Sequence, residues 1–306
     1  MNKTRKKNVL SVMWKHRALY LMILPAIITV FIFHYIPLYG VVMAFQDYRP
    51  SLGIWGSEWV GLKHFVNFVK YPYFWKIMKN TLTISLWSFT TFPLPIIFAI
   101  MLNELKNGKL KKVSQMVTYA PHFVSTVVVC SMVTLFVKED GLINIIIGLL
   151  GGSSVDFISL PEAFAPIYTI SGLWQGLGWS SIIYVSSLAG VNSEQVEAAK
   201  IDGAGRMQVI RHIYLAHLKP VIAINFLMKI GALLSIGFEK VYLLQNPLNM
   251  ETSSILATYA YDIGLVGGQY SYSAAVGLFD NIINLILVIL ANYIVKKVSS
   301  NEVGLW

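Results

Sequence analysis

The sequence predicts an all-α integral membrane protein with about six transmembrane helices, and two observations lead to this fold class. Of the 306 residues, 56% are hydrophobic and only 13% carry a charge, whereas about a quarter of the residues in a soluble globular protein are charged. Several apolar segments also approach or exceed the roughly 20 residues that a helix needs to cross a bilayer. We therefore expect lipid, rather than water, to surround most of the chain.

Six segments are predicted to span the membrane. The first covers residues 18–45 and follows a basic stretch without a signal-peptide-like cleavage site, so it is interpreted as an uncleaved signal-anchor. The other five cover residues 80–103, 115–137, 165–189, 218–240 and 272–295. Prolines inside these segments are expected to bend the helices, because proline lacks a backbone donor: Pro25, Pro37, Pro93, Pro95 and Pro121.

Lysine and arginine are distributed unevenly between the predicted loops. Placing the N-terminus inside puts most of the 24 Lys and Arg residues on the cytoplasmic side, as the positive-inside rule requires. Both termini are therefore predicted to be cytoplasmic, with a basic tail at 1–17, a transmembrane domain at 18–296 and a short tail at 297–306. The net charge of +9 is attributed to anchoring on anionic membrane lipid, so no nucleic acid is expected as a partner.

Motifs for enzymatic chemistry are missing from the sequence. There is no G-x-x-x-x-G-K-[ST] motif, so the chain carries no nucleotide-binding loop of its own. Its six histidines show no metal-ligand spacing, and the single cysteine, Cys130, excludes a disulfide framework. The sequence therefore predicts a protein that is not an enzyme and that holds no cofactor or metal. A transporter independent of an ATPase and, less favoured, an intramembrane enzyme are kept as alternatives.

The loop between the fourth and fifth spans, residues 191–217, contains an unusually polar segment, EAAKIDGAG. Ser193 is predicted to cap a helix that begins near Glu194, and Gly203 and Gly205 are expected to allow a tight turn. A second amphipathic stretch, VIRHIYL, then leads into the fifth span. On physical grounds alone, a solvated loop helix and a helix that enters a cleft of a soluble partner are equally good interpretations.

This loop resembles the E-A-A…D-G-A…I-x-L-P…P signature of permease subunits of bacterial binding-protein-dependent ABC importers. The matching residues are Glu197, Ala198, Ala199, Asp202, Gly203, Ala204, Ile213, Leu215 and Pro220. Ala216 stands where the family has proline, which bears on the rigidity of the turn that leaves the loop. In that family the loop helix is a coupling helix that docks into an ATPase subunit. The resemblance implies this role for residues 197–199 and 202–204.

Other segments resemble the carbohydrate branch of the same family, closest to the group of oligosaccharide and polysaccharide permeases named for YteP and LplB. They are WVGLKHF at 59–65, NTLTIS at 80–85, YAPHFVSTVVV at 119–129, WQGLGWSSIIY at 174–184 and GLW at 304–306.

The resemblance implies a type I ABC importer permease fold in a bacterial cell membrane, working by alternating access. It implies four kinds of partner: a second permease subunit that forms a heterodimer with this one, two ATPase subunits that bind ATP and magnesium, an extracellular solute-binding lipoprotein, and an oligosaccharide substrate.

Depth along the spans selects candidates for the substrate pathway. At 1.5 Å per residue, Lys229 and Asp280 are expected near the middle of the bilayer, where charges usually face a partner or a water-filled cavity. These two residues are predicted either to pair with each other or to line the pathway. If Lys229 faces the cavity, an acidic oligosaccharide, for example one derived from pectin or rhamnogalacturonan, becomes the favoured substrate.

The full set of pathway candidates adds aromatic faces for sugar rings and polar groups for sugar hydroxyls. It consists of Trp174, Gln175, Trp179, Tyr184, Asn225, Lys229, Asp280, Asn281 and Asn284. Packing or interfacial anchoring is the competing role for the aromatic members. Gly172 and Gly176 form a G-x-x-x-G pair, which is predicted to bring two helices close together.

Overall fold

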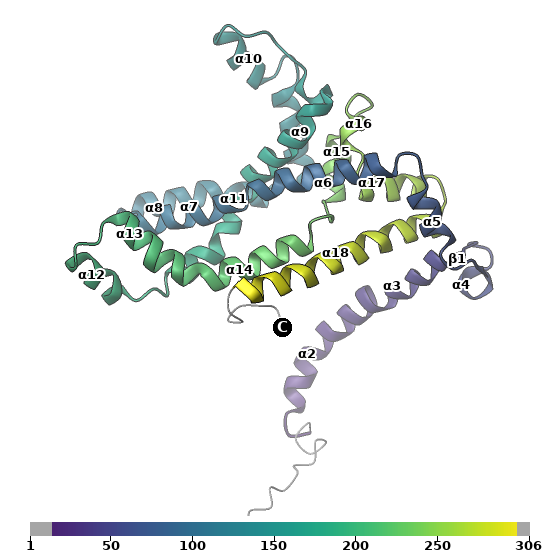
Figure 1. The fold of residues 1–306 in the computed structure, drawn as a ribbon, viewed down its shortest axis with the longest axis horizontal. Coiled ribbons are helices and arrows are strands. Elements are labelled where there is room, and N and C mark those ends of the chain that lie inside the picture. The colour runs from purple at the N-terminus through teal and green to yellow at the C-terminus, as the bar shows by residue number, and fades with distance from the viewer. Residues whose placement is uncertain (1–13, 299–306) are drawn as a thin grey trace, which may run out of the picture.

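The computed structural model describes residues 14–298 and is built almost entirely of helices (Figure 1). Residues 1–13 and 299–306, which include most of both predicted tails and the terminal GLW, lie outside the described part. Within the described part, four helices are long and apolar enough to cross a membrane, and a sharply bent pair of helices is a fifth candidate span. The predicted all-α membrane architecture is therefore confirmed.

The first predicted span is a continuous helical segment from Arg17 to Phe45. It is formed by α2 (Arg17–Val30), η1 (Phe31–Tyr35), α3 (Ile36–Leu38) and η2 (Tyr39–Phe45). None of its most apolar window is buried within this chain. The segment stands apart from the other helices except at its end, where η2 contacts α18 (Tyr270–Val298) (Figure 1).

A short hairpin and an aromatic cluster follow the first span. In the hairpin, β1 (Gln46–Asp47) pairs antiparallel with β2 (Glu58–Trp59), in the register Gln46 to Trp59 and Asp47 to Glu58, with α4 (Gly53–Gly56) between them. α5 (Lys63–Val69) then inserts Phe68 among four rings, the nearby Phe74 and the sequence-distant Tyr259, Tyr272 and Phe279. This cluster joins the hairpin region to α18.

The second span is longer than predicted and is interrupted once. α6 (Phe74–Thr90) begins six residues before the predicted start at 80, and α7 (Pro93–Glu104) continues the same span of 31 residues. The interruption falls at Thr91 and Phe92, directly before Pro93, which cannot donate a backbone hydrogen bond to the preceding turn.

The third predicted span, 115–137, bends near Pro121 as expected, but the bend is a sharp break between two helical halves rather than a kink within one helix. α8 (Gly108–Tyr119) ends in η3 (Ala120–Phe123), and α9 (Thr126–Val137) leads to α10 (Leu142–Leu149). The two halves meet at an angle of 101°. Pro121 removes a donor, Val124 is extended, and the Ser125 hydroxyl accepts from the Val128 backbone N–H to start the next helix.

The predicted fourth span, 165–189, corresponds to α11 (Phe164–Leu188), which lies at the centre of the fold. α11 packs against α6, α7, α8 and α14 (Leu215–Gly231). Its 25 residues are enough to cross a bilayer, yet it is not among the helices that pass by length and apolarity together. Because four helices pack against parts of its surface, α11 does not have to present an entirely apolar surface to lipid.

The fifth span differs from its prediction, 218–240, at both ends. The helix runs without interruption from Arg206 to Gly231, through α13 (Arg206–Val209), η6 (Ile210–Tyr214) and α14. It therefore passes straight through Ala216 without a turn. Residues 232–237 are not regularly helical, and a separate helix, α15 (Phe238–Leu244), follows them.

Asn284 of α18 holds this break in place. Its Oδ1 accepts from the Leu234 backbone N–H at 3.0 Å, and its Nδ2 donates to the Ser235 hydroxyl at 3.0 Å. A buried backbone group outside a helix needs such a partner. Because the partner is distant in sequence, hydropathy alone predicts an unbroken helix here.

The remaining elements are short. They are η4 (Phe157–Ser159), η5 (Pro161–Ala163), α16 (Met250–Ser253), α17 (Leu256–Tyr261) and η7 (Asp262–Val266). α18 then contains the whole predicted sixth span, 272–295, and confirms it as a helix.

Candidate functional site

A cavity lies among the central helices. Its volume is about 610 Å³, within the range of about 300–1,000 Å³ that is typical of small-molecule sites. The walls come from α6, α7, α11, α14 and α15. The lining residues are Ser88, Thr91, Phe92, Pro95, Tyr168, Thr169, Gly172, Leu173, Gln175, Gly176, Leu177, Trp179, Ser180, Ile183, Tyr184, Asn225, Lys229 and Lys240.

Lys229 lines this cavity from the last turn of α14. Its Nζ donates to the Ser88 carbonyl oxygen at 2.8 Å and lies 5.7 Å from the ring centres of Phe89 and Phe92. No ion pair found within residues 14–298 includes Lys229 or Asp280. Lys229 and Asp280 were predicted either to pair or to line the pathway, and within the described residues they do not pair directly.

Asp280 lies elsewhere, on α18. Its Oδ1 accepts from the Asn284 side chain at 3.3 Å, and it is absent from the residues that line the cavity. Asp280 thus stands beside the residue that fixes the break after α14.

The other predicted pathway residues divide into two groups. Gln175, Trp179, Tyr184 and Asn225 line the cavity together with Lys229. Trp174, Asp280, Asn281 and Asn284 do not. Trp174 lines a separate apolar cavity of about 280 Å³ between α9, α10 and α11, Asn281 is exposed, and Asn284 is buried at the break.

Lys240 is a second cation of the cavity, and it was not among the residues predicted for the pathway. The fifth span was predicted to continue to residue 240, which put this lysine at the outer end of the span. The break at 232–237 turns the chain, so that the side chain is only 9% exposed. Its Nζ donates to the Tyr168 carbonyl oxygen at 2.8 Å and lies 4.7 Å from the Tyr168 ring centre. The pair of glycines that bounds the break, Gly231 and Gly237, is the signal that could have suggested it.

The G-x-x-x-G pair does not have the predicted role. Gly172 and Gly176 line the cavity, and a Cβ at Gly172 would lie 3.0 Å from the Lys240 Nζ rather than against another helix. The close approach between helices occurs instead at Gly178, where a Cβ would lie 2.3 Å from the Thr118 carbonyl oxygen of α8.

The loop 191–217 begins with α12 (Ser193–Ile201) at the end of the molecule opposite α5 (Figure 1). Its cap is Asn192 rather than the predicted Ser193, because the Asn192 Oδ1 accepts from the Glu194 backbone N–H at 2.8 Å. Gly203 has φ +85° and makes the tight turn that was predicted. Gly205 has φ −71°, so its conformation is open to any residue.

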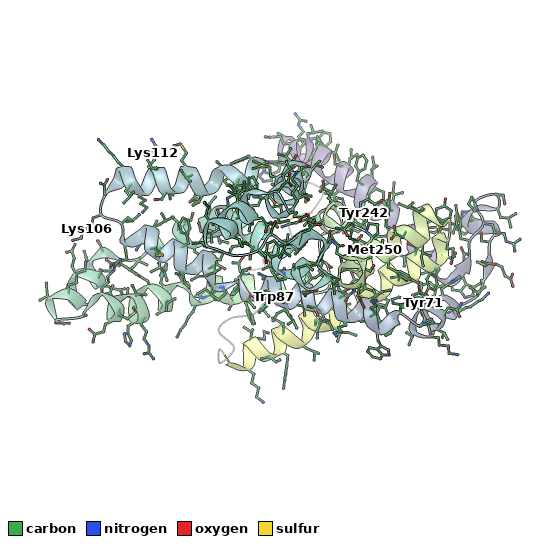
Figure 2. All side chains as sticks on the ribbon, turned by 90° about the horizontal axis from the view of Figure 1, so that it is seen from above. Tyr71, Trp87, Lys106, Lys112, Tyr242 and Met250 are labelled. Atoms are coloured by element: carbon green, nitrogen blue, oxygen red, sulfur yellow. The ribbon has the colours of Figure 1, made fainter. Side chains whose placement is uncertain are left out.

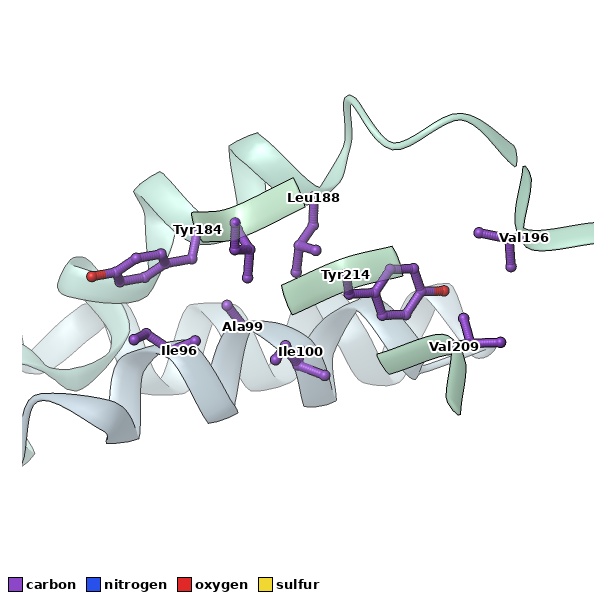
Figure 3. Close-up of a cluster of buried hydrophobic side chains, with 9 residues drawn as sticks. Ile96, Ala99, Ile100, Tyr184, Leu188, Val196, Val209 and Tyr214 are labelled. Carbon is purple, nitrogen blue, oxygen red and sulfur yellow. The ribbon is translucent and has the colours of Figure 1, made fainter. Parts of the chain in front are cut away.

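One side of this loop packs inward (Figure 3). Val196 of α12, with Val209 and Tyr214, lies against Ile96, Ala99 and Ile100 of α7 and against Tyr184 and Leu188 of α11. Ala199 and Ala204 pack on the same cluster. An ion pair of 2.7 Å between Arg206 and Glu104 adds a second link from the loop to α7.

The other side of the loop is exposed. It presents Glu197, Ala198, Asp202 and Gly203, and Ile201 is 86% exposed. A groove of about 350 Å³ lies beside these residues and is lined by Ala199, Asp202, Gly203, Ala204, Gln208, Val209, His212 and Ile213. The motif residues therefore divide into inward anchors and an outward face.

Comparison with known proteins identifies the class to which this architecture belongs. Residues 92–300 match the family described as binding-protein-dependent transport system inner membrane component. The chain therefore belongs to this family: it is a multi-pass permease component of an ABC importer in the inner membrane. In such importers the ATPase is a separate subunit, so this chain is a transport component without a cofactor of its own.

Individual relatives cover almost the whole chain. The polygalacturonan/rhamnogalacturonan transport system permease protein YteP of Bacillus subtilis (strain 168) is 45% identical over 96% of this chain and 92% of its own length. Protein LplB of the same organism is 42% identical over 91% of this chain and 88% of its own.

Two solved structures have the same fold. A chain of a bacterial ABC transporter involved in the import of the acidic polysaccharide alginate is 35% identical, with a TM-score of 0.86 over 95% of this chain and 99% of its own. A chain of the bacterial alginate ABC transporter in complex with an alginate pentasaccharide-bound periplasmic protein is 34% identical, with a TM-score of 0.88 over 98% and 100%. The type I importer permease fold predicted from the resemblance is confirmed.

Proposed function

We propose that this chain forms half of the transmembrane pathway of an importer for acidic oligosaccharides. The observation that carries the proposal is the charge of the cavity. Lys229 lines it, and among the residues of 14–298 that line it there is no aspartate or glutamate. A cation without a counter-charge in a membrane cavity is costly unless an anion or water compensates it.

The names of the relatives agree with this charge. One is a permease for polygalacturonan and rhamnogalacturonan, and the solved structures belong to a transporter of the acidic polysaccharide alginate. A shared preference for acidic sugars would account for a cationic cavity in this chain.

The remaining cavity residues suit a sugar. Trp179 and Tyr184 both line the cavity; His122 stacks on one face of the Trp179 ring with ring centres 4.3 Å apart, so the C–H surface of a sugar ring would pack on the opposite face. Gln175 and Asn225 supply amides that can bond hydroxyl groups. We assign the pathway wall to these four residues and Lys229. Trp174, Asp280, Asn281 and Asn284 are assigned to the surrounding scaffold.

The exposed face of the α12 loop is proposed as the docking surface for an ATPase subunit. Glu197, Ala198, Asp202 and Gly203 would touch the ATPase, while Ala199 and Ala204 anchor the loop to α7 and α11. Lys106 and Lys112 lie at the same end of the molecule as this loop (Figure 2). Such a concentration of lysine supports a cytoplasmic position for that end.

The complete importer then contains this chain, a second permease subunit, two ATPase subunits and a solute-binding lipoprotein. Both termini of this chain are assigned to the cytoplasm of a bacterial cell. Closure of the ATPase subunits would move the α12 loops and open the cavity outward, and ATP hydrolysis would return it to the inward-facing state.

The charge proposal is tested with Lys229→Gln in the complete transporter, reconstituted with its binding protein. Uptake of a galacturonate trisaccharide is compared with uptake of its carboxyl-reduced, neutral counterpart. A charge-assisted hydrogen bond contributes about 1.5–3 kcal/mol, so the acidic sugar should lose roughly 10-fold or more relative to the neutral one. Lys70→Gln, which removes an exposed lysine, is the matched control. An equal loss for both sugars would contradict the proposal.

The coupling proposal is tested with Glu197→Lys. The variant should remain in the membrane but lose both transport and co-purification with the ATPase subunits. Gln195→Lys is the control, because Gln195 is also exposed on α12 but lies outside the matched motif. Full uptake by Glu197→Lys would remove the docking assignment.

A further inference from the structure

Lys240 is a buried cation at the cavity that has no role in the proposed function. It lines the same cavity as Lys229 but comes from another helix, α15. The side chain is 9% exposed, and its carbonyl partner is a backbone oxygen, that of Tyr168. An ammonium group has three donors, and within the described residues one of them is used in this hydrogen bond.

The electrostatic cost of this arrangement points to a missing anion. Removing one partner of a buried ion pair, which leaves a buried charge uncompensated, typically costs about 3–5 kcal/mol. No ion pair within residues 14–298 includes Lys240, and the adjacent carboxylate, Glu239, is exposed. The Tyr168 ring compensates only part of the charge, since such a contact contributes about 0.5–2 kcal/mol.

The surroundings of Lys240 are shaped to keep its ammonium group at the cavity. Residues 232–237 leave the helical path, and Asn284 holds them there through Leu234 and Ser235. Gly172 on the facing helix has no side chain to occupy the place where the ammonium lies, 3.0 Å from a Cβ built at that position. Thr169, whose buried hydroxyl has no hydrogen-bond partner in the described part of the chain, lines the same region.

We propose that Lys240 and Lys229 form a two-point site, in which each ammonium binds one carboxylate of the same oligosaccharide. The cavity then distinguishes a sugar with two acidic residues from one with a single acidic residue. This inference rests on the proposed function, because it takes an acidic sugar as the substrate. It adds Lys240 as a residue that determines how many charges the substrate must carry.

The test uses the complete reconstituted transporter and three probes of equal length. These are a trisaccharide of galacturonate, the same trisaccharide with one uronate left acidic and the others carboxyl-reduced, and the fully reduced neutral form. Rates are expressed as the ratio of variant to wild type for each probe, so the preference of the unchanged binding protein cancels.

Lys240→Met should lower uptake of the fully acidic probe by roughly 10-fold or more, the loss expected for one charge-assisted hydrogen bond. The neutral probe should be unaffected, and the preference for the fully acidic over the singly acidic probe should disappear. Lys229→Gln should have the same signature, and the double variant should not distinguish acidic from neutral sugars. Lys240→Arg should retain part of the preference, and Lys70→Gln all of it.

The competing explanation is that a carboxylate of the second permease subunit pairs with Lys240. In that case Lys240→Met would lower all three rates equally and would lower the melting temperature of the assembled complex. ATPase activity stimulated by the binding protein, measured without sugar, reports whether the variant still assembles. Equal effects on the three probes for Lys240→Met, with a selective effect for Lys229→Gln, would overturn this inference alone. Equal effects for both lysines would overturn the proposed function as well.

Discussion

Gly178 is expected to tolerate no side chain. It lies on α11 where α8 passes, and a Cβ built on it would lie 2.3 Å from the Thr118 carbonyl oxygen and 2.5 Å from its carbon. Both are backbone atoms, so they cannot rotate away, and the two helices would have to separate. Overpacking of this kind typically costs about 1–3 kcal/mol. We expect Gly178→Ala to lower the free energy of unfolding by this amount, and Gly178→Val by more.

The assay is thermal unfolding of the purified transporter in detergent, with Gly176→Ala as the control. Gly176 lies two residues away on the same helix, and the nearest atom to a Cβ there is the Ser180 hydroxyl oxygen at 4.0 Å, an ordinary contact. Alanine is favoured over glycine in a helix by up to about 1 kcal/mol, so this control should be as stable as the wild type. Equal melting temperatures for Gly178→Ala and the wild type would refute the close packing of α8 on α11.

Two further changes follow from backbone geometry and buried hydrogen bonds. Gly203→Ala places a side chain at φ +85° and should destabilise the α12 loop by about 1–2 kcal/mol. The measurement is amide hydrogen exchange, which should become faster in this loop. Unchanged exchange, or an equal change in the control Gly205→Ala, would argue against the turn. Asn284→Leu leaves the Leu234 backbone N–H without its partner and should lower the free energy of unfolding by about 1–3 kcal/mol. The same replacement at the exposed Asn281 should change it by no more than about 0.5 kcal/mol, and similar melting temperatures for the two variants would mean that Asn284 does not hold the break.

Hydropathy was sufficient to predict the spans that are continuous helices. The segments 18–45 and 272–295 both lie within long helices of nearly the same extent. It failed where a side chain from elsewhere satisfies the backbone, because such a bond leaves no mark on the local composition. The break at 232–237 depends on Asn284, which is about 50 residues further along the chain.

Prolines and helix-capping residues marked bends and helix ends correctly, but they did not always specify a single geometry or a single residue. Pro121 correctly marked a bend, yet proline alone does not distinguish a gentle kink from the 101° corner that the structure contains. Asn192 and Ser193 are both good caps, and only the geometry shows that Asn192 is the one used.

Only some of the residues that line the cavity were predicted from the sequence. Lys229 was selected by its depth along a helix, and Gln175, Trp179, Tyr184 and Asn225 were selected because their side chains suit a sugar; all five line the cavity. Lys240 was missed because the same counting assumes an unbroken helix. The division of the loop motif into exposed and anchoring residues also required the structure, since it depends on contacts with α7 and α11.

If the α12 loop is the docking surface proposed for an ATPase subunit, Tyr184 is the residue that connects this loop to the cavity. Tyr184 belongs both to the cluster under the α12 loop and to the wall of the cavity. α11, which carries it, is one uninterrupted helix of 25 residues, about 37 Å long at 1.5 Å per residue. A displacement of the loop that preserves this packing would move α11 as one rigid helix, and Gln175 and Trp179 on the same helix would move with it. Because α11 has no break that could take up the displacement of the α12 loop, the cavity wall on α11 would move together with the loop.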